Sequence, residues 1–230
     1  MILARLALGA AAGWAAYAWG AHLFTPGCIW HGPATRRAIA LTFDDGPDPA
    51  WTDRTLDLLD RHAVSASFFL VGERAARAPE TVRRIAAAGH EVGSHGWSHR
   101  SLWLCGPRRT DDEIARARAV LSETTGRLIR YFRPPWGMVN AAMFAALRRH
   151  GQQCVFWSIQ PEGLRATPPE RQVDYVVDHA RPGAIVDLHD AEGLRDAPER
   201  LLAALPPMIR RLRNLGYEFS TVGELLEPTL

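Results

Sequence analysis

Short apolar runs that alternate with amphipathic runs constrain the fold of this 230-residue chain more than any other feature. The amphipathic runs have the residue spacing of helices, and three of them, 79–89, 111–126 and 197–216, end at a glycine, as helices often do. The apolar runs are short and separated by turn formers, which is typical of buried strands. We expect strands at 38–43, 66–71, 90–95, 129–133, 153–158, 184–189 and 217–222.

Strands that alternate with helices predict parallel βα units and an α/β fold. About seven strands at a spacing of roughly 30 residues favour a closed or nearly closed (β/α) barrel over an open sheet. In such a barrel the functional residues lie at the carboxyl ends of the strands. Chemically reactive side chains should therefore gather there.

Composition narrows the classes of function. Hydrophobic residues make up 47% of the chain, enough for one sizeable core. The net charge of +2 gives no electrostatic case for binding nucleic acid. The cysteines form no CxxC pair, so neither a disulfide framework nor a cysteine-based zinc cluster is indicated. They are Cys28, Cys105 and Cys154.

The N-terminal segment differs from the rest, because Arg5 is the only charged residue among its first 24. We interpret 1–25 as a hydrophobic helix that acts as a signal anchor, with the following domain exported to a periplasmic or other extracytoplasmic space. A signal peptide cleaved near 16–18, which would give a secreted protein, and a soluble amphipathic helix are the alternatives. Residues 26–35 are then a linker.

The loop at 101–107 is unusually apolar for a surface connection. Such a loop either packs under a neighbouring helix or lies against a bilayer beside the N-terminal segment. The second alternative points to a lipid-linked substrate.

Reactive side chains follow four of the expected strands directly. Two adjacent carboxylates follow the first strand, two imidazoles the third, an arginine the fourth and another imidazole the sixth. A solvated turn explains any one of these placements but not their shared position at the strand ends. The residues are Asp44, Asp45, His95, His99, Arg133 and His189.

Metal binding is the chemistry that this set suggests first. His95 and His99 are four residues apart at a strand-to-loop junction and can converge on one cation. A third ligand from a carboxylate would complete an open catalytic site. Asp44 and Asp45 repel each other unless a cation or a proton relieves them. One Asp and two His ligands suit zinc, with cobalt or nickel as alternatives.

The motifs "TFDDGPD", "SHGWSH", "RPPWG" and "DLHD" resemble, in order and approximate spacing, those of the polysaccharide deacetylase family. This family is also called the NodB-homology or carbohydrate esterase 4 family. The resemblance covers about residues 36–226 and makes 36–230 the catalytic domain. It implies a distorted (β/α) barrel and metal-dependent removal of the N-acetyl group from an amino sugar. The substrate would be a chitooligosaccharide, peptidoglycan or a lipid-linked glycan.

The resemblance also implies roles for individual residues. Asp44 is similar to the general base, Asp45 to the third metal ligand and His189 to the general acid. Arg133 resembles the residue that orients the base, and the backbone N–H of Trp136 resembles an oxyanion donor. The remaining pocket residues implied by the family are Leu188, Trp157 and Pro134.

The sequence departs from the family pattern in its fourth motif. Gln160 and Gly163 stand where aspartates would hold the acid histidine. Without them the pKa of His189 should fall, unless Glu162, Asp187 or Asp190 substitutes.

Two alternatives to a sugar N-deacetylase remain open, and the altered fourth motif permits the first of them. One is a non-catalytic sugar-binding protein. The other is a hydrolase of a different amide, such as an N-formyl sugar or an imide. Near the metal residues, Gly96 replaces a usual Ser or Thr, which removes a hydroxyl but no ligand.

Overall fold

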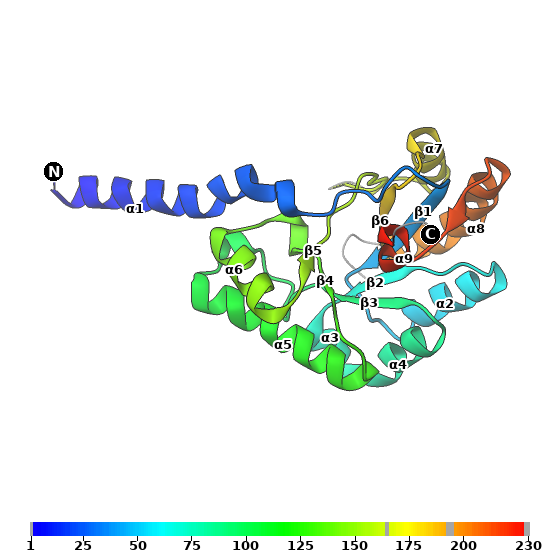
Figure 1. Ribbon diagram of the computed structural model, residues 1–230, viewed down its shortest axis with the longest axis horizontal. Coiled ribbons are helices and arrows are strands. Elements are labelled where there is room, and N and C mark those ends of the chain that lie inside the picture. Colours follow the sequence, from blue (N-terminus) through cyan, green and yellow to red (C-terminus); the bar gives the residue numbers. More distant parts are fainter. Residues whose placement is uncertain (1, 164–165, 192–195, 228–230) are drawn as a thin grey trace.

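The computed structural model describes residues 2–163, 166–191 and 196–227. Helix α1 (Ile2–Ala18) projects from a body in which helices surround a sheet (Figure 1). None of the helices formed by the described residues is both long and apolar enough to cross a membrane. The signal anchor and the signal peptide both remain predictions.

All seven expected strands are present, and every pairing between them is parallel. The sheet order is β5-β4-β3-β2-β1-β6, and β7 pairs with β1. The shortest strands are β4, β5 and β7, each of two residues. Their bounds are β1 Ala38–Asp44, β2 Ser67–Leu70, β3 Glu91–Ser94, β4 Tyr131–Phe132, β5 Gln153–Cys154, β6 Ile185–His189 and β7 Glu218–Phe219.

Isolated bridges, rather than a full ladder, bring the two ends of the sheet together. Ile159 pairs with Val186 of β6, and Ile29 pairs with Val155 just after β5. The predicted distorted barrel is therefore confirmed. Residues 28–32, which we expected to belong to a linker, are partly built into this closure, because Ile29 N donates to Cys154 O at 2.8 Å.

Helices cover the outside of the barrel and contact one another around it, as the βα alternation predicts (Figure 1). Three 3₁₀ turns, η1 (Gly20–Gly27), η2 (Leu102–Leu104) and η3 (Pro135–Gly137), lie in connections. The helices after α1 are α2 Thr52–Arg61, α3 Gly72–Arg77, α4 Pro79–Ala87, α5 Pro107–Thr125, α6 Ala141–His150, α7 Pro169–His179, α8 Ala197–Asn214 and α9 Val222–Leu226.

The two faces of strand β1 carry different kinds of side chain, apolar on the outer face and, toward its carboxyl end, polar on the inner face. All seven of its residues are buried, and successive side chains point to opposite faces. Ile39, Leu41 and Phe43 pack in the large cluster beneath the outer helices. Thr42 and Asp44 occupy the other, inner face. Because the outer face already supplies the hydrophobic packing, the inner face can carry polar groups.

The turn into β6 depends on a glycine. Gly183 has a positive φ of 80°, and an added Cβ there would lie 2.3 Å from the carbonyl oxygen of Gly32. Gly89 has a similar φ of 82° but nothing within 4 Å of such a Cβ. A side chain at Gly89 would therefore meet backbone strain alone, whereas one at Gly183 would meet both strain and a steric clash.

We expect Gly183→Ala to lower the free energy of unfolding by at least about 2 kcal/mol, because strain and backbone collision add together. Gly89→Ala, the matched control, should lose only about 1 kcal/mol from strain. Urea unfolding of both variants measures the difference. Equal losses would contradict the close approach between Gly183 and Gly32.

Candidate metal and acid–base site

The pairing of β1 with β6 assembles the inner face of the site. Thr42 lies opposite Asp187 and Asp44 opposite His189. Since residues two apart in a strand share a face, these four side chains form a square on the inner wall of the barrel. Sequence positions about 145 apart thus become neighbours through the register of one parallel pair.

Arg133, at the end of β4, crosses the barrel interior to this square. Its side chain is 0% exposed. Nη1 donates to Asp44 Oδ1 at 2.7 Å, to Thr42 Oγ1 at 2.8 Å and to Asp187 Oδ1 at 3.2 Å. The guanidinium also lies over the ring of Phe69 at 4.1 Å. One buried cation therefore offsets the repulsion between two buried carboxylates.

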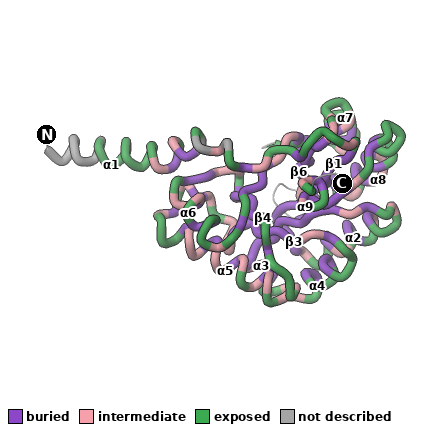
Figure 2. The backbone as a smooth tube through the Cα atoms, in the orientation of Figure 1, coloured by how far each residue is buried: buried purple, intermediate pink, exposed green. Residues whose placement is uncertain are grey.

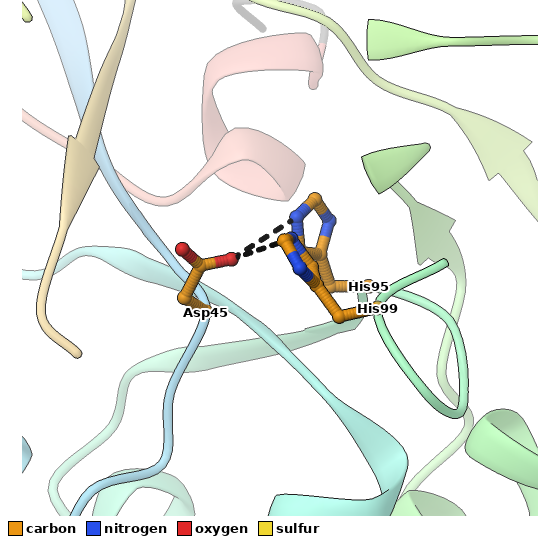
Figure 3. Close-up of side chains that lie close together, drawn as sticks. All are labelled: Asp45, His95 and His99. Carbon is orange, nitrogen blue, oxygen red and sulfur yellow. Dashed lines mark ion pairs between the residues drawn. The ribbon is translucent and has the colours of Figure 1, made fainter. Parts of the chain in front are cut away.

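The three expected metal ligands converge at the ends of β1 and β3. Figure 3 shows the Asp45 carboxylate directed toward both imidazoles. Asp45 Oδ1 lies 2.8 Å from His99 Nε2 and 3.5 Å from His95 Nε2. Ligands of a tetrahedral zinc, each roughly 2.0–2.1 Å from the ion, are themselves about 3.4 Å apart. The cluster has the size of a divalent metal site.

The chemistry of this donor set also fits a cation. Asp45 Oδ1 is buried and has no hydrogen bond of good geometry to any described residue, although His99 is close. Nδ1–H of His95 donates to the carbonyl oxygen of Arg133 at 2.8 Å, which leaves Nε2 as a lone-pair donor facing Asp45. Asp45, His95 and His99 therefore offer three convergent donor atoms.

The pKa values agree with this donor set. Burial lowers the pKa of His95 to about 4, so its imidazole is neutral near pH 7. Burial alone would raise the pKa of Asp45, but His99 and the other nearby imidazoles hold it well below its usual value. Asp45 is therefore a carboxylate at neutral pH, as a ligand must be.

Backbone strain gathers at the same place. Five non-glycine residues in the described part of the chain have positive φ, and three of them belong to the site: Asp45 at 74°, His99 at 56° and Trp136 at 61°. Such conformations are disfavoured and persist where the surrounding structure imposes them, often at functional sites. The loop that carries His99 is held by Glu113 of α5, which accepts from Ser98 N and Ser98 Oγ, both at 2.7 Å.

A cavity of about 350 Å³ opens over these residues. Trp136 stands on its rim, 58% exposed, with its ring 5.2 Å from that of His99. Trp157 lines another wall. The other residues of the acid–base and metal sets that line the cavity are Asp44, Asp45, His95, His99, Asp187 and His189.

Two expected pocket residues do not line this cavity. Leu188 lies on the outer face of β6, opposite Asp187 and His189, and packs in the core beneath the helices. Pro134 is buried and is likewise not among the lining residues in the described part of the chain. The pocket position that the family resemblance implied for Leu188 therefore does not fit its side-chain direction.

Of the three candidates for the missing fourth-motif carboxylate, two are engaged elsewhere. Glu162 Oε1 accepts from Nε and Nη2 of Arg200 at 2.9 and 2.7 Å. Asp190 Oδ2 accepts from Thr52 Oγ1 at 2.5 Å. Asp187 is the one that shares the inner face of β6 with His189.

Sequence reasoning expected the pKa of His189 to fall unless such a substitute existed. Burial does lower it, but the carboxylates around His189, Asp187 foremost, raise it above its ordinary value overall. Asp187 therefore has the effect on the pKa of His189 that a fourth-motif aspartate would have.

A (β/α) barrel with three histidines and three aspartates around a cavity at its strand ends has the make-up of a barrel hydrolase. The family model for polysaccharide deacetylase matches residues 31–155. A peptidoglycan-N-acetylglucosamine deacetylase of Bacillus cereus is 35% identical over 86% of this chain and 92% of its own length. The chain therefore belongs to the polysaccharide deacetylase family.

Other relatives agree with this assignment. A chitooligosaccharide deacetylase of a Bradyrhizobium species is 37% identical over 82% of this chain and 90% of its own length. A solved structure of the peptidoglycan N-acetylglucosamine deacetylase Bc1960 superposes with a TM-score of 0.82 at 28% identity, covering 88% of this chain and 94% of that one.

We expect His99→Ala to weaken zinc binding by at least about 100-fold, because it removes one of three converging ligands. Isothermal titration of the full chain with zinc measures the affinity. His179→Ala, on the surface of α7, is the control and should bind zinc like the unmodified chain. An unchanged affinity in His99→Ala would show that zinc binds elsewhere.

Proposed function

We propose that this protein is a metal-dependent N-deacetylase that hydrolyses the N-acetyl group of an amino sugar in a glycan and releases acetate. One observation carries the proposal: an arginine-held carboxylate, Asp44, lies beside the Asp45–His95–His99 cluster, and His189 faces it from the paired strand. The names of the relatives support the same reaction.

Asp45, His95 and His99 would hold the metal. When bound, a divalent cation there supplies Lewis-acid activation of water and of the amide carbonyl. The protein's own task is to place proton donors and acceptors around that point.

Asp44 divides its two oxygens between two tasks. Oδ1 is fixed by Arg133 at 2.7 Å, whereas Oδ2 faces the metal cluster, 3.7 Å from His95 Nε2. The second oxygen is therefore placed to take a proton from the attacking water. Arg133 fixes the rotamer without blocking that oxygen.

His189 is the group that can return a proton. Water adds to the amide carbon, the C–N bond breaks, and the leaving nitrogen must gain a proton to depart as an amine. A histidine with a raised pKa still carries that proton near neutrality.

Asp187 takes over the part of the missing fourth-motif aspartate. Burial raises its pKa to about 7, while His189 and Arg133 lower it, so Asp187 and His189 titrate as an interacting pair. Gln160 has become a partner of Trp157 instead, accepting from its indole N–H at 3.2 Å.

The substrate class follows from the cavity walls. Trp136 and Trp157 offer aromatic surface of the kind that stacks on sugar rings. We propose peptidoglycan or chitooligosaccharide units as substrates, in line with the relatives. A binding protein without activity is less consistent with a site in which Asp44, Arg133 and His189 are all in place.

Asp44→Asn should reduce acetate release from N-acetylglucosamine oligomers by roughly 100-fold or more, because the amide cannot accept the proton. Zinc affinity should be retained, since Asp44 is not one of the three ligands. Asp174→Asn, a surface aspartate paired with Arg211, is the control. Full activity in Asp44→Asn would exclude it as the base.

Asp187→Asn tests the pairing with His189. Because the Asp187 carboxylate raises the pKa of His189, its removal should lower that pKa. His189 would then lose its proton at lower pH, and the alkaline limb of the kcat/KM profile should move toward acid. Glu162→Gln, which removes the weakest of the carboxylate influences on His189, should shift it less. An unmoved limb in Asp187→Asn would refute the pairing.

A further inference from the structure

The middle of α1 is apolar on every side and exposed on every side. Residues 9–16, "GAAAGWAA", are all exposed, and none carries a charge. Figure 2 shows this stretch as a tube without a buried stripe, projecting from the body. A helix that packs on its own domain buries one apolar face, whereas a helix that is apolar all round is normally covered on all sides. Something outside this chain is therefore needed to cover it.

The carboxyl end of α1 is joined to the loop that contains η2. The indole N–H of Trp14 donates to Trp103 O at 2.9 Å, and the Tyr17 hydroxyl donates to Cys105 O at 3.1 Å. The rings of Trp19 and Trp103 lie 5.9 Å apart. Helix and loop thus form one continuous surface.

This surface, which we call the aromatic surface, exposes large apolar groups. Leu104 is 82% exposed and Trp19 is 67% exposed. An apolar loop tip of this kind would ordinarily pack inward. Its members are Trp14, Tyr17, Trp19, Trp103 and Leu104.

The charged groups beside the aromatic surface that a partner could contact are positive. Arg100 and Arg108 flank the loop and are exposed. The acidic residues that follow in α5 are engaged: Asp112 pairs with Arg109 and Arg116. A partner that combines apolar material with negative charge therefore matches, and a bilayer containing anionic lipid has both.

We propose that the aromatic surface lies on the interface of an anionic lipid bilayer. Tryptophan and tyrosine side chains favour the headgroup region, where their rings are apolar and their N–H and O–H groups remain wet. Binding in that plane combines burial of apolar area with attraction of arginine to anionic headgroups. It places the carboxyl end of α1 and the η2 loop at the same depth.

Hydrogen bonds connect the loop of the aromatic surface to residues beside the cavity. Asn140 Nδ2 donates to Leu102 O at 2.7 Å and to Cys105 O at 3.1 Å, which fixes the loop to the start of α6. Ser101 Oγ lies 3.0 Å from the sulfur of Met138, a residue that lines the cavity. If the proposed function holds, the cavity therefore receives glycan close to a membrane surface.

An environment-sensitive label tests the proposal in the full chain without using catalysis. The label (NBD) is attached to a Leu104→Cys variant, and the three native cysteines are buried and so disfavour reaction. Leu128→Cys is the matched control, because Leu128 is 71% exposed but precedes β4, at the other end of the barrel. Vesicles are phosphatidylcholine with or without phosphatidylglycerol.

With anionic vesicles we expect the label at position 104 to shift to shorter wavelength and the label at 128 to keep its aqueous emission. The shift should weaken in neutral vesicles, in high salt and in the Arg108→Glu background. Aqueous emission at position 104 on vesicle-bound protein would overturn the proposal. So would a shift without lipid that grows with protein concentration, since a second copy would then cover the surface.

Discussion

The burial of a single guanidinium constrains the rest of this structure. Arg133 has no exposed surface, and a buried charge is tolerated only when it is paired and hydrogen-bonded. Its partners come from β1, β6 and the segment after β5, because it also donates to Phe156 O at 3.0 Å. The arginine, which follows β4, therefore ties β4 to β1 and β6, neither of which is its neighbour in the sheet. Removing one partner of such a network typically costs 3–5 kcal/mol, so the carboxylates of the site are also part of its scaffold.

In the proposed mechanism, that dual role lets the site work with an altered fourth motif. A carboxylate that assists His189 has to be buried close to it, and burial requires a cation nearby. Arg133 already serves Asp44, and its Nη1 is within 3.2 Å of Asp187 as well. Asp187 can thus occupy the inner face of β6 with its negative charge paired to Arg133. Gln160 and Gly163 are uncharged and need no such partner. In the proposed mechanism, the carboxylate that raises the pKa of His189 thus comes from β6 instead of from the fourth motif.

Much of this could be predicted from the sequence, because strand ends in a barrel converge whatever the loop lengths. The seven strands and the positions of Asp44, Asp45, His95, His99 and His189 followed from that rule and from the motifs. The direction of Leu188 was also available: with Asp187 and His189 facing inward, alternation turns the residue between them outward. The pairing of Ile29 with Val155 was not predictable, because a single bridge leaves no periodic pattern. Glu113 was missed because an acidic residue in a helix usually faces solvent.

Buried negative charge is concentrated at this end of the barrel. Asp44, Asp45, Asp187 and Asp190 are all buried around the same strand ends, against one arginine. Burial raises the pKa of Asp187 and of Asp190 to about 7, so protons compensate part of this excess negative charge. A divalent cation at Asp45, His95 and His99 would supply positive charge at the same end of the barrel and favour the ionised carboxylates. Metal binding at Asp45, His95 and His99 would therefore be linked to proton release from Asp187 and Asp190.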